Sequence, residues 1–255
     1  MNSIKITGLK NLISKFLFHP CVFTLLFHSM TATSILTAQN SINIEGAGQK
    51  WVNFGDADVS GNQITVEAIV RRQNNMNIVS KHNGTTDCNY LLRPNSFQIT
   101  TTDDFYICLN PYTLAPNTWY HVAATYDGAF IKYYVDGCLV NEIEATGDII
   151  TNDWDGAIGN RSNWPNGPEH FRGRLDEVRI WQESRTEEEI KLNMNLILNP
   201  TAEANLVAYF RLDNNYNNAQ GNAAFDGVPQ GTPVFDAAPP IFIPFEVLSV
   251  TQTDV

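Results

Sequence analysis

Carboxylates in predicted strands are the first residues of this sequence that could do chemistry. Asp176 and Glu177 are neighbours in the segment Phe171–Trp181. Neighbouring residues of a strand point to opposite faces of the sheet, so these two cannot act together as acid and base. His121 lies among apolar residues without a serine or cysteine in a nucleophile motif, which favours a structural role. Because the sequence also lacks P-loop, G-x-S-x-G, H-E-x-x-H and C-x-x-C motifs, we expect no enzyme.

A polar loop with one tryptophan is the best candidate for ligand binding. It runs from Asn160 to His170 and holds Trp164 among asparagine, proline and glycine residues. An exposed tryptophan can stack on the apolar face of a sugar while Asn160, Arg161 and Asn163 bind its hydroxyl groups. The alternative is that Trp164 folds back over the edge of the domain, and the sequence leaves both open.

The N-terminus predicts a cleavable signal peptide. Three lysines and no acidic residue precede or flank the start of an apolar run, Phe16–Leu26, and small and polar residues lead to Ala38. This order is typical of export, with cleavage after Ala38. A membrane anchor is the weaker alternative, because the apolar run is shorter than the ~20 residues of a transmembrane helix. We expect a secreted or cell-surface protein with no membrane insertion after cleavage.

The charge of the chain limits its partners. The 255 residues carry a formal net charge of −11, and removal of residues 1–38, with their three lysines and no acid, leaves 217 residues at −14. Such a surface repels nucleic acid and anionic membranes, so neither is an expected partner. The remaining length suits one large β-sandwich.

Three cysteines remain after loss of the leader, which takes Cys21 with it. Cys88, Cys108 and Cys138 would lie in an oxidising compartment, so we expect one disulfide bond among them. The sequence does not choose among the three pairings. The alternative, in which all three stay as small buried thiols, also remains open.

Alternation of apolar and polar residues predicts an all-β domain. Thr65–Val70, His121–Tyr126 and Phe130–Val135 are rich in aromatic and β-branched residues, and Asp127-Gly128 and Asp136-Gly137 are tight-turn signals. This pattern is typical of an antiparallel sandwich or barrel.

Two segments depart from the strand pattern. A capping residue, Ser184 or Thr186, precedes three glutamates and an apolar stripe, which predicts one short helix near residues 185–197. Two adjacent prolines follow Asp236, and a new apolar run begins at Ile241. We therefore expect one domain over residues 39–236, and a linker with the start of a further domain over residues 237–255.

Three blocks of sequence carry a family resemblance. They are Asn117–Gly128 (NTWYHVAATYDG) followed by Tyr134–Gly137 (YVDG), Phe171–Trp181 (FRGRLDEVRIW) followed by Arg185–Ile190 (RTEEEI), and Leu206–Asp213 (LVAYFRLD). In this order they resemble laminin G-like domains of the concanavalin A-like jelly-roll family. The resemblance implies a two-sheet antiparallel jelly-roll sandwich, in agreement with the strand periodicity.

The resemblance also bears on catalysis and on metal binding. The glucanase relatives carry an E-x-D-x-E strand, a spacing that neither Glu142-Ile143-Glu144 nor Asp176-Glu177 reproduces. Pentraxin relatives bind calcium through carboxylates after a glycine that resembles Gly159, where this sequence has Asn-Arg-Ser.

A structural calcium ion of the glucanase relatives suggests one metal ligand here. Transfer of that site puts forward Asp176, with backbone carbonyls near Glu45–Gly48 as companions. The alternative is that Asp176 pairs with Arg174, with Arg179 or with a loop amide.

Together these observations predict a secreted, non-catalytic binding or adhesion module that recognises a glycan or an extracellular protein. A structural spacer domain of a larger surface protein is the alternative, and a glycan hydrolase is the third and least favoured hypothesis.

Overall fold

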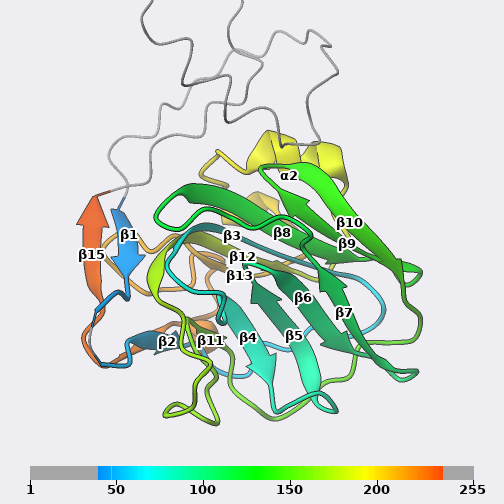
Figure 1. Ribbon diagram of the computed structural model, residues 1–255, viewed down its shortest axis with the longest axis horizontal. Coiled ribbons are helices and arrows are strands. Elements are labelled where there is room, and N and C mark those ends of the chain that lie inside the picture. The colour runs from blue at the N-terminus through cyan, green and yellow to red at the C-terminus, as the bar shows by residue number, and fades with distance from the viewer. Residues whose placement is uncertain (1–39, 47, 238–255) are drawn as a thin grey trace, which may run out of the picture.

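The computed structural model describes residues 40–46 and 48–237, and its strands form two packed antiparallel sheets (Figure 1). The expectation of an all-β, two-sheet antiparallel sandwich is confirmed. Sheet A contains, in spatial order, β10 (Cys138–Glu144), β9 (Phe130–Val135), β8 (Trp119–Tyr126), β3 (Ile64–Arg72), β12 (Gly173–Trp181), β1 (Asn40–Asn43) and β15 (Val234–Ala237), and β13 (Leu206–Phe210) pairs with β12.

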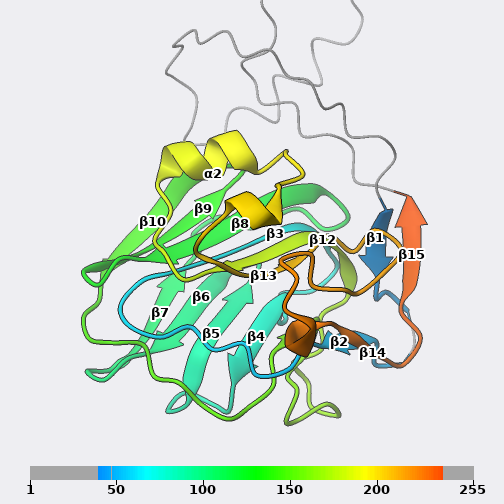
Figure 2. The same cartoon turned by 180° about the vertical axis from the view of Figure 1, so that it is seen from behind.

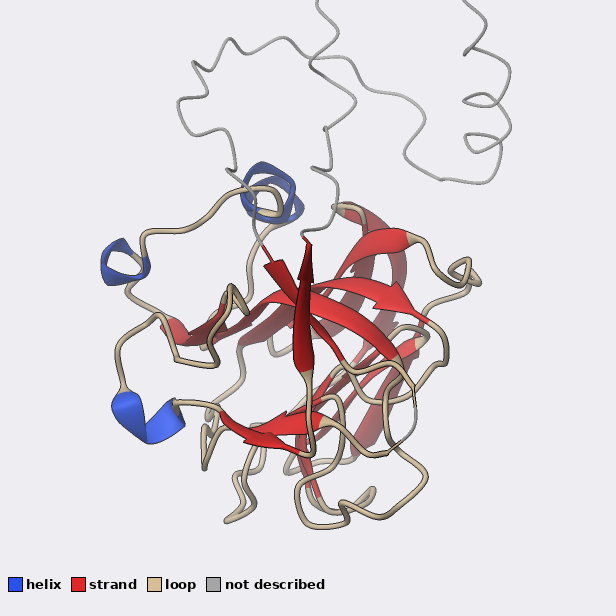
Figure 3. Cartoon of the chain, turned by 90° about the vertical axis from the view of Figure 1, so that its left-hand side faces the viewer, coloured by secondary structure: helices blue, strands red, loops and turns tan. Residues whose placement is uncertain are grey.

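Sheet B faces the viewer in Figure 1, and the chain crosses repeatedly between the two sheets. Its strands are, in spatial order, β14 (Val228–Gln230), β2 (Trp51–Asn53), β11 (Ala157–Ile158), β4 (Val79–His82), β5 (Cys88–Arg93), β6 (Ser96–Thr100) and β7 (Phe105–Leu109). Figure 3 shows the two sheets from the side, with β1 and β15 in front.

The core lies between the two sheets, and the period-two pattern fills it. Val66 is opposite Ala124, and Ala124 is opposite Tyr133 on the next strand; all three are fully buried in one apolar cluster. From sheet B, Tyr90 and Phe97 join the same cluster. Burial of aromatic and branched side chains from both inner faces is what stabilises a sandwich of this kind.

The turn between β9 and β10 follows the predicted hairpin chemistry. Asp136 and Gly137 both have positive φ, at 48° and 77°, which is the two-residue turn that matches strand twist. The side chain of Asp136 also accepts a hydrogen bond from the backbone amide of His121 at 2.8 Å. The Asp-Gly pair therefore fixes this hairpin and ties it to β8.

The predicted short helix is present as α2 (Glu187–Asn193). Thr186 caps it: its hydroxyl accepts a hydrogen bond from the amide of Glu189, and the Glu189 carboxylate accepts one from the amide of Thr186. This reciprocal pair satisfies two backbone donors at the helix start. Two short 3-10 helices follow, η1 (Pro200–Ala202) and η2 (Ala223–Phe225), on the connections around β13 (Figure 2).

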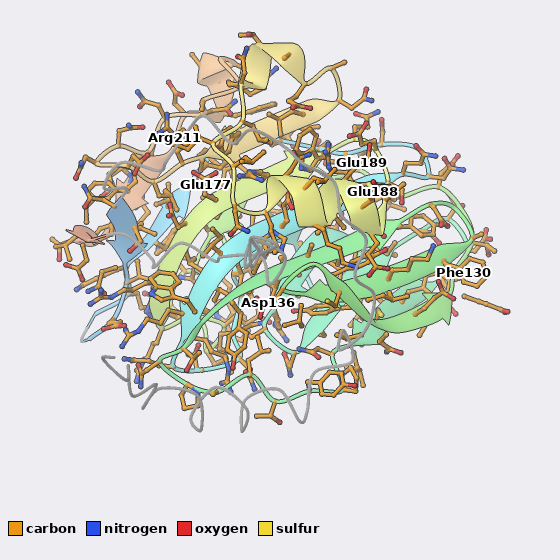
Figure 4. The ribbon with its side chains drawn as sticks, turned by 90° about the horizontal axis from the view of Figure 1, so that it is seen from above. Phe130, Asp136, Glu177, Glu188, Glu189 and Arg211 are labelled. Carbon is orange, nitrogen blue, oxygen red and sulfur yellow. The ribbon has the colours of Figure 1, made fainter. Side chains whose placement is uncertain are left out.

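A buried charged cluster holds α2 against the outer face of sheet A. The guanidinium of Arg179 donates to the backbone carbonyl of Asn193, the last residue of α2, at 3.0 Å and to that of Leu196, just beyond the helix, at 2.6 Å. It also pairs with Glu177 at 2.5 Å and with Glu67 at 3.4 Å. Figure 4 shows Glu177 on β12 beside α2. The D-E-V-R-I-W block thus anchors the helix that follows it.

The charges of this cluster compensate one another. Burial alone would raise the pKa of Glu67, but the charge of Arg179 and the hydrogen bond with His121 outweigh burial and lower the pKa to about 2. Trp181 donates its indole N–H to the same carboxylate at 3.1 Å. His121 is therefore a structural histidine in the described residues, as its apolar surroundings in the sequence indicated.

The expected disulfide bond among the three described cysteines is not formed, because Cys88 and Cys108 are both free, buried thiols. Strand β6 lies between β5, which holds Cys88, and β7, which holds Cys108. Two strand spacings come to about 9–10 Å, beyond the reach of a disulfide. Cys138 lies in the other sheet, at the start of β10. The prediction of one disulfide bond among these three cysteines was wrong, because it did not take the strand order into account.

The predicted signal peptide, residues 1–38, lies outside the described residues. So does the predicted linker, residues 237–255, except for its first residue, Ala237, which ends β15. That strand, β15, pairs with β1, so the sandwich extends through Ala237, the last described residue. Within the described ranges, no helix is long and apolar enough to cross a membrane.

Candidate functional site

The loop predicted to bind ligand connects β11 to β12 and lies against the outer face of sheet B. Gly159 begins it with φ of 86°, and Phe171 closes it by donating its amide to the Gly159 carbonyl at 2.9 Å. Val79 points into the core, so its neighbour Ser80 points outward, where its hydroxyl donates to the Asn160 carbonyl at 2.7 Å. Figure 1 shows these yellow-green connections around β11 beside β4.

Glu169 is the residue that fixes the loop to the sheet. Its carboxylate contacts His82 at 3.2 Å and Arg93 at 3.2 Å, both from strands of sheet B, and Arg161 at 3.9 Å. Asn77 joins the cluster by donating to the carboxylate at 3.4 Å. These contacts connect the loop to two neighbouring strands through one side chain.

The surroundings of Glu169 stabilise its charged form. Burial alone would raise its pKa, but the hydrogen bond with His82 and the charges of Arg93 and Arg161 outweigh burial and lower the pKa to about 2. The carboxylate is therefore ionised at all physiological pH values. It acts as a permanent ionic anchor for the loop.

Asn160 and Arg161, predicted to contact a sugar, instead shape the loop. Asn160 is fully buried and donates its amide to the Pro165 carbonyl at 3.0 Å, so its side chain cannot reach a ligand. Arg161 donates to the side-chain oxygens of Asn163 at 2.7 Å and Asn83 at 2.5 Å. Both side chains therefore maintain the conformation of the loop, and ligand binding by this loop stays a prediction.

Trp164 is the predicted site residue that does face solvent. Its side chain is 49% exposed, and its ring contacts Gly167 and lies under the guanidinium of Arg161, 5.5 Å from the ring centroid. A Cβ on Gly167 would come within 2.6 Å of the ring, so only glycine fits here. Of the two alternatives, the structure favours an exposed Trp164 over one folded back on the edge of the domain. Gly167 and Arg161 hold the ring in this position.

A second tryptophan, Trp154, belongs to the same surface and was not predicted. It is 36% exposed, and its indole N–H donates to Asp87 at 2.7 Å. The next residue, Asp155, accepts a hydrogen bond from the Ser162 hydroxyl at 2.5 Å, which joins the two loops. The sequence signal was the same as for Trp164, a tryptophan among Asn, Asp and Gly residues. We refer to Trp154, Trp164 and the segment 160–170 as the loop platform.

A pocket of about 290 Å³ opens beside the loop platform. It lies between the end of the loop, the β3–β4 connection and the residues before β2. Its lining residues are Gly48, Gln49, Asn74, Gly167, Pro168, His170 and Arg172. Gly167 therefore belongs to the pocket wall and also contacts the Trp164 ring.

Asp176, the predicted calcium ligand, lies away from this surface and is fully buried. The backbone carbonyls near Glu45, expected as further ligands, do not lie beside Asp176. The amide of Ile44 donates to the carbonyl of Gly173, which precedes Asp176 by three residues, or about 10 Å, along β12. Glu45 instead pairs with Arg71 at 2.7 Å. One carboxyl oxygen of Asp176 accepts the backbone amide of the next residue of β12, Glu177, at 3.0 Å, which is neither of the two arginines nor a loop amide.

The environment of Asp176 opposes its ionisation. Burial, followed by the nearby charges of Glu177 and Asp213, raises the pKa of Asp176 to about 9. Its second carboxyl oxygen has no hydrogen-bond partner among the described residues. No group of three or more His, Cys, Asp or Glu side chains in the described ranges is arranged to hold a metal ion. Calcium binding through Asp176 stays a prediction.

Comparison with known proteins agrees with this fold and with the sequence blocks. A laminin G-type family model, described as the concanavalin A-like lectin/glucanases superfamily, matches residues 46–191, more than half of the chain. The chain belongs to this superfamily. No curated protein matches it in sequence at a significant level.

Two solved structures with the same sandwich fold are similar to this chain. A protein from Bacteroides ovatus to which carbohydrate binding has been ascribed matches with a TM-score of 0.63 and 22% identity over 79% of this chain. The match covers 60% of the Bacteroides protein. The heptameric SAP-like pentraxin of Limulus polyphemus matches with a TM-score of 0.54 and 14% identity, over 80% of this chain and 98% of the pentraxin. At these identities the likeness concerns the fold.

Proposed function

We propose that this protein is a secreted, non-catalytic module that binds glycan through the loop platform. The observation that carries the proposal is Trp164, half exposed on a loop whose conformation is held by buried polar contacts. An indole ring in this position presents apolar area to a sugar ring. Membership of a superfamily of lectins and glucanases, and the carbohydrate binding ascribed to the Bacteroides relative, support it.

The hydrogen bonds and ion pairs that hold the loop also support the proposal of ligand binding. Asn160 donates to Pro165 within the loop, and Arg161 contacts Asn83 and Glu169. Glu169 in turn contacts His82 and Arg93 of sheet B. A surface that is already ordered loses little conformational entropy when a ligand binds, so weak stacking contacts can yield measurable affinity. The residues that the sequence assigned to sugar contact therefore serve the same function indirectly.

Three of the described glutamates support the proposal of a non-catalytic role. Glu67 and Glu177 are engaged by Arg179 and buried under α2, and Glu169 is engaged by His82 and Arg93. None of the three combines solvent access with a neighbouring carboxylate, as glycoside hydrolysis needs. Digestion assays across polysaccharides should therefore release no product, and release of reducing ends would contradict this part of the proposal.

Secretion is proposed from the N-terminal sequence. The mature chain should begin at or near Gln39, which places the start of the domain one residue before β1. N-terminal sequencing of exported protein tests this. Exported material that still carries residues 1–38 would contradict cleavage.

The test of the binding site is a single substitution with a matched control. Trp164→Ala should abolish or strongly weaken binding across a glycan array, because it removes the indole ring on which the apolar face of a sugar would stack. Leu192→Ala is the control, since Leu192 is equally exposed, at 50%, but lies on α2 at the other sheet. Unchanged glycan binding by Trp164→Ala would refute the site, and binding of extracellular proteins but no glycan would refute the ligand class.

A further inference from the structure

We propose that the pocket beside the loop platform takes the anionic group, a carboxylate or a sulfate ester, of an acidic sugar. The proposal rests on the glycan-binding function above and names the substrate class for the same site. It is argued from the pocket wall, from one arginine without a partner and from one buried histidine.

Arg172 is the first observation. In the described residues no carboxylate lies within ion-pair distance of its guanidinium, and its side chain donates no hydrogen bond to the protein. The other described arginines all contact a carboxylate or, for Arg72, a backbone carbonyl. In a chain of net charge −11, an unpaired arginine in a pocket wall is available for an anion.

His170 is the second observation. It lines the pocket and is 8% exposed, and neither ring nitrogen makes a hydrogen bond of normal geometry with the described residues. The Gly159 carbonyl is the nearest acceptor, and it offsets only part of the lowering of the His170 pKa by burial and by the charge of Arg172. A buried polar group without a partner costs free energy that a ligand can recover. At least one ring nitrogen carries a proton in either neutral tautomer, so His170 can donate to an anionic oxygen.

Asn74 holds these two side chains in place. Its amide donates to the His170 carbonyl at 2.9 Å, and its oxygen accepts the Arg172 amide at 3.0 Å. Both contacts are made to the backbone, just before β12 begins at Gly173. Both side chains line the pocket, and they are close enough for the charge of Arg172, after burial, to lower the pKa of His170.

The remaining pocket wall suits an anion of a sugar rather than a hydrophobic group. Gln49 and Asn74 supply amides, Gly48 and Gly167 leave the backbone open, and the wall contains no carboxylate. Glu169 is next to His170 in sequence, but its carboxylate is turned to His82 and Arg93. Since Gly167 also contacts the Trp164 ring, one acidic sugar chain can touch both features.

The experiment measures binding of the full chain to four probes by calorimetry. The probes are a uronic-acid oligosaccharide, a sulfated oligosaccharide, the neutral oligosaccharide of the same length, and an acidic peptide. We expect one of the two acidic oligosaccharides to bind more tightly than the neutral one, and the one preferred identifies the anion. The preference should weaken as ionic strength rises, because charge attraction is screened by salt.

Variants assign the preference to the pocket. Arg172→Gln should reduce affinity for the acidic probe by about tenfold or more and leave the neutral probe unaffected, since hydrogen bonds to charged groups contribute in this range. His170→Gln should weaken acidic binding to a smaller extent. Arg211→Gln is the control, because Arg211 is a partly exposed arginine that follows β13 and pairs with Asp213 at 2.7 Å. Arg172→Gln should also have the same melting temperature as the parent, because the substitution removes no contact within the described residues.

The outcomes separate this inference from the function on which it rests. If no oligosaccharide binds the parent protein, both proposals are refuted. If neutral and acidic sugars bind equally well, or if Arg172→Gln retains the full preference, only the acidic-sugar inference is overturned. Binding of the acidic peptide alone would overturn it in favour of a protein ligand.

Discussion

Substitution of Asp176 by Asn gives a pH-dependent gain in stability that follows from its burial. Asp176 is fully buried with a pKa raised to about 9, against the ordinary 3.8 of the unfolded chain. Between these two values the unfolded state releases a proton that the folded state keeps. Stability of the parent protein therefore falls as pH rises across this window, by up to about 1.4 kcal/mol per pH unit.

The magnitude for Asp176→Asn follows from the same window. From pH 5 to pH 7 the variant should gain up to about 2.7 kcal/mol relative to the parent, because asparagine does not ionise. Its side-chain oxygen can still accept the amide of Glu177, so the backbone contact is kept. The new amide nitrogen takes the place of an oxygen that has no described partner, and its cost is independent of pH.

The assay is urea unfolding, followed by tryptophan fluorescence, at several pH values from 4 to 8 with a chelator present. The expected result is a difference in free energy of unfolding between variant and parent that increases with pH. A constant difference over this range would refute the protonated, buried state of Asp176. Repetition with millimolar calcium tests the metal prediction, because a calcium ligand would make the parent, and not the variant, more stable on addition of the ion.

Three further predictions concern the anchors of the fold and of the loop. Glu169→Gln should destabilise the protein by about 1–3 kcal/mol above pH 4.5. The difference from the parent should disappear as pH falls through about 2, where the Glu169 carboxylate of the parent becomes protonated. Melting curves over this pH range test the prediction. Arg179→Met should cost about 3–5 kcal/mol in urea unfolding, because it leaves Glu67 and Glu177 buried without their cation, and Arg179→Lys should not restore the parent value. Cys88 and Cys108 should resist alkylation in the native protein and react after denaturation, since burial raises the pKa of both thiols, that of Cys108 to about 12; peptide mass mapping that finds either one modified in the native state would contradict their burial.

The parts of the fold that depend on local sequence were predictable. Asp136-Gly137 specifies a tight turn by itself, and Thr186 with Glu189 specifies a helix start within four residues. The period-two pattern places side chains such as Val66 on the core face of a strand. In each case the controlling interaction lies within a few residues of chain.

The parts that depend on strand order were not predictable. Cys88 and Cys108 are 20 residues apart in the sequence, but β6 separates their strands. The exposed Trp164 was singled out in the sequence because tryptophan stands out among small polar residues. The inward turn of Asn160 was missed because its partner is set by the folded loop, and Glu169 was missed because Arg93 reaches it from a strand 76 residues earlier.

The central claim, that a glycan binds at the loop platform, is tested most directly by the indole N–H resonances of the five tryptophans during glycan titration. Trp164 should shift most and Trp154 should shift with it, whereas Trp181, fully buried against Leu206 and Tyr209 on sheet A, should stay unchanged. Saturable binding of a glycan that leaves the Trp164 resonance in place would contradict the account.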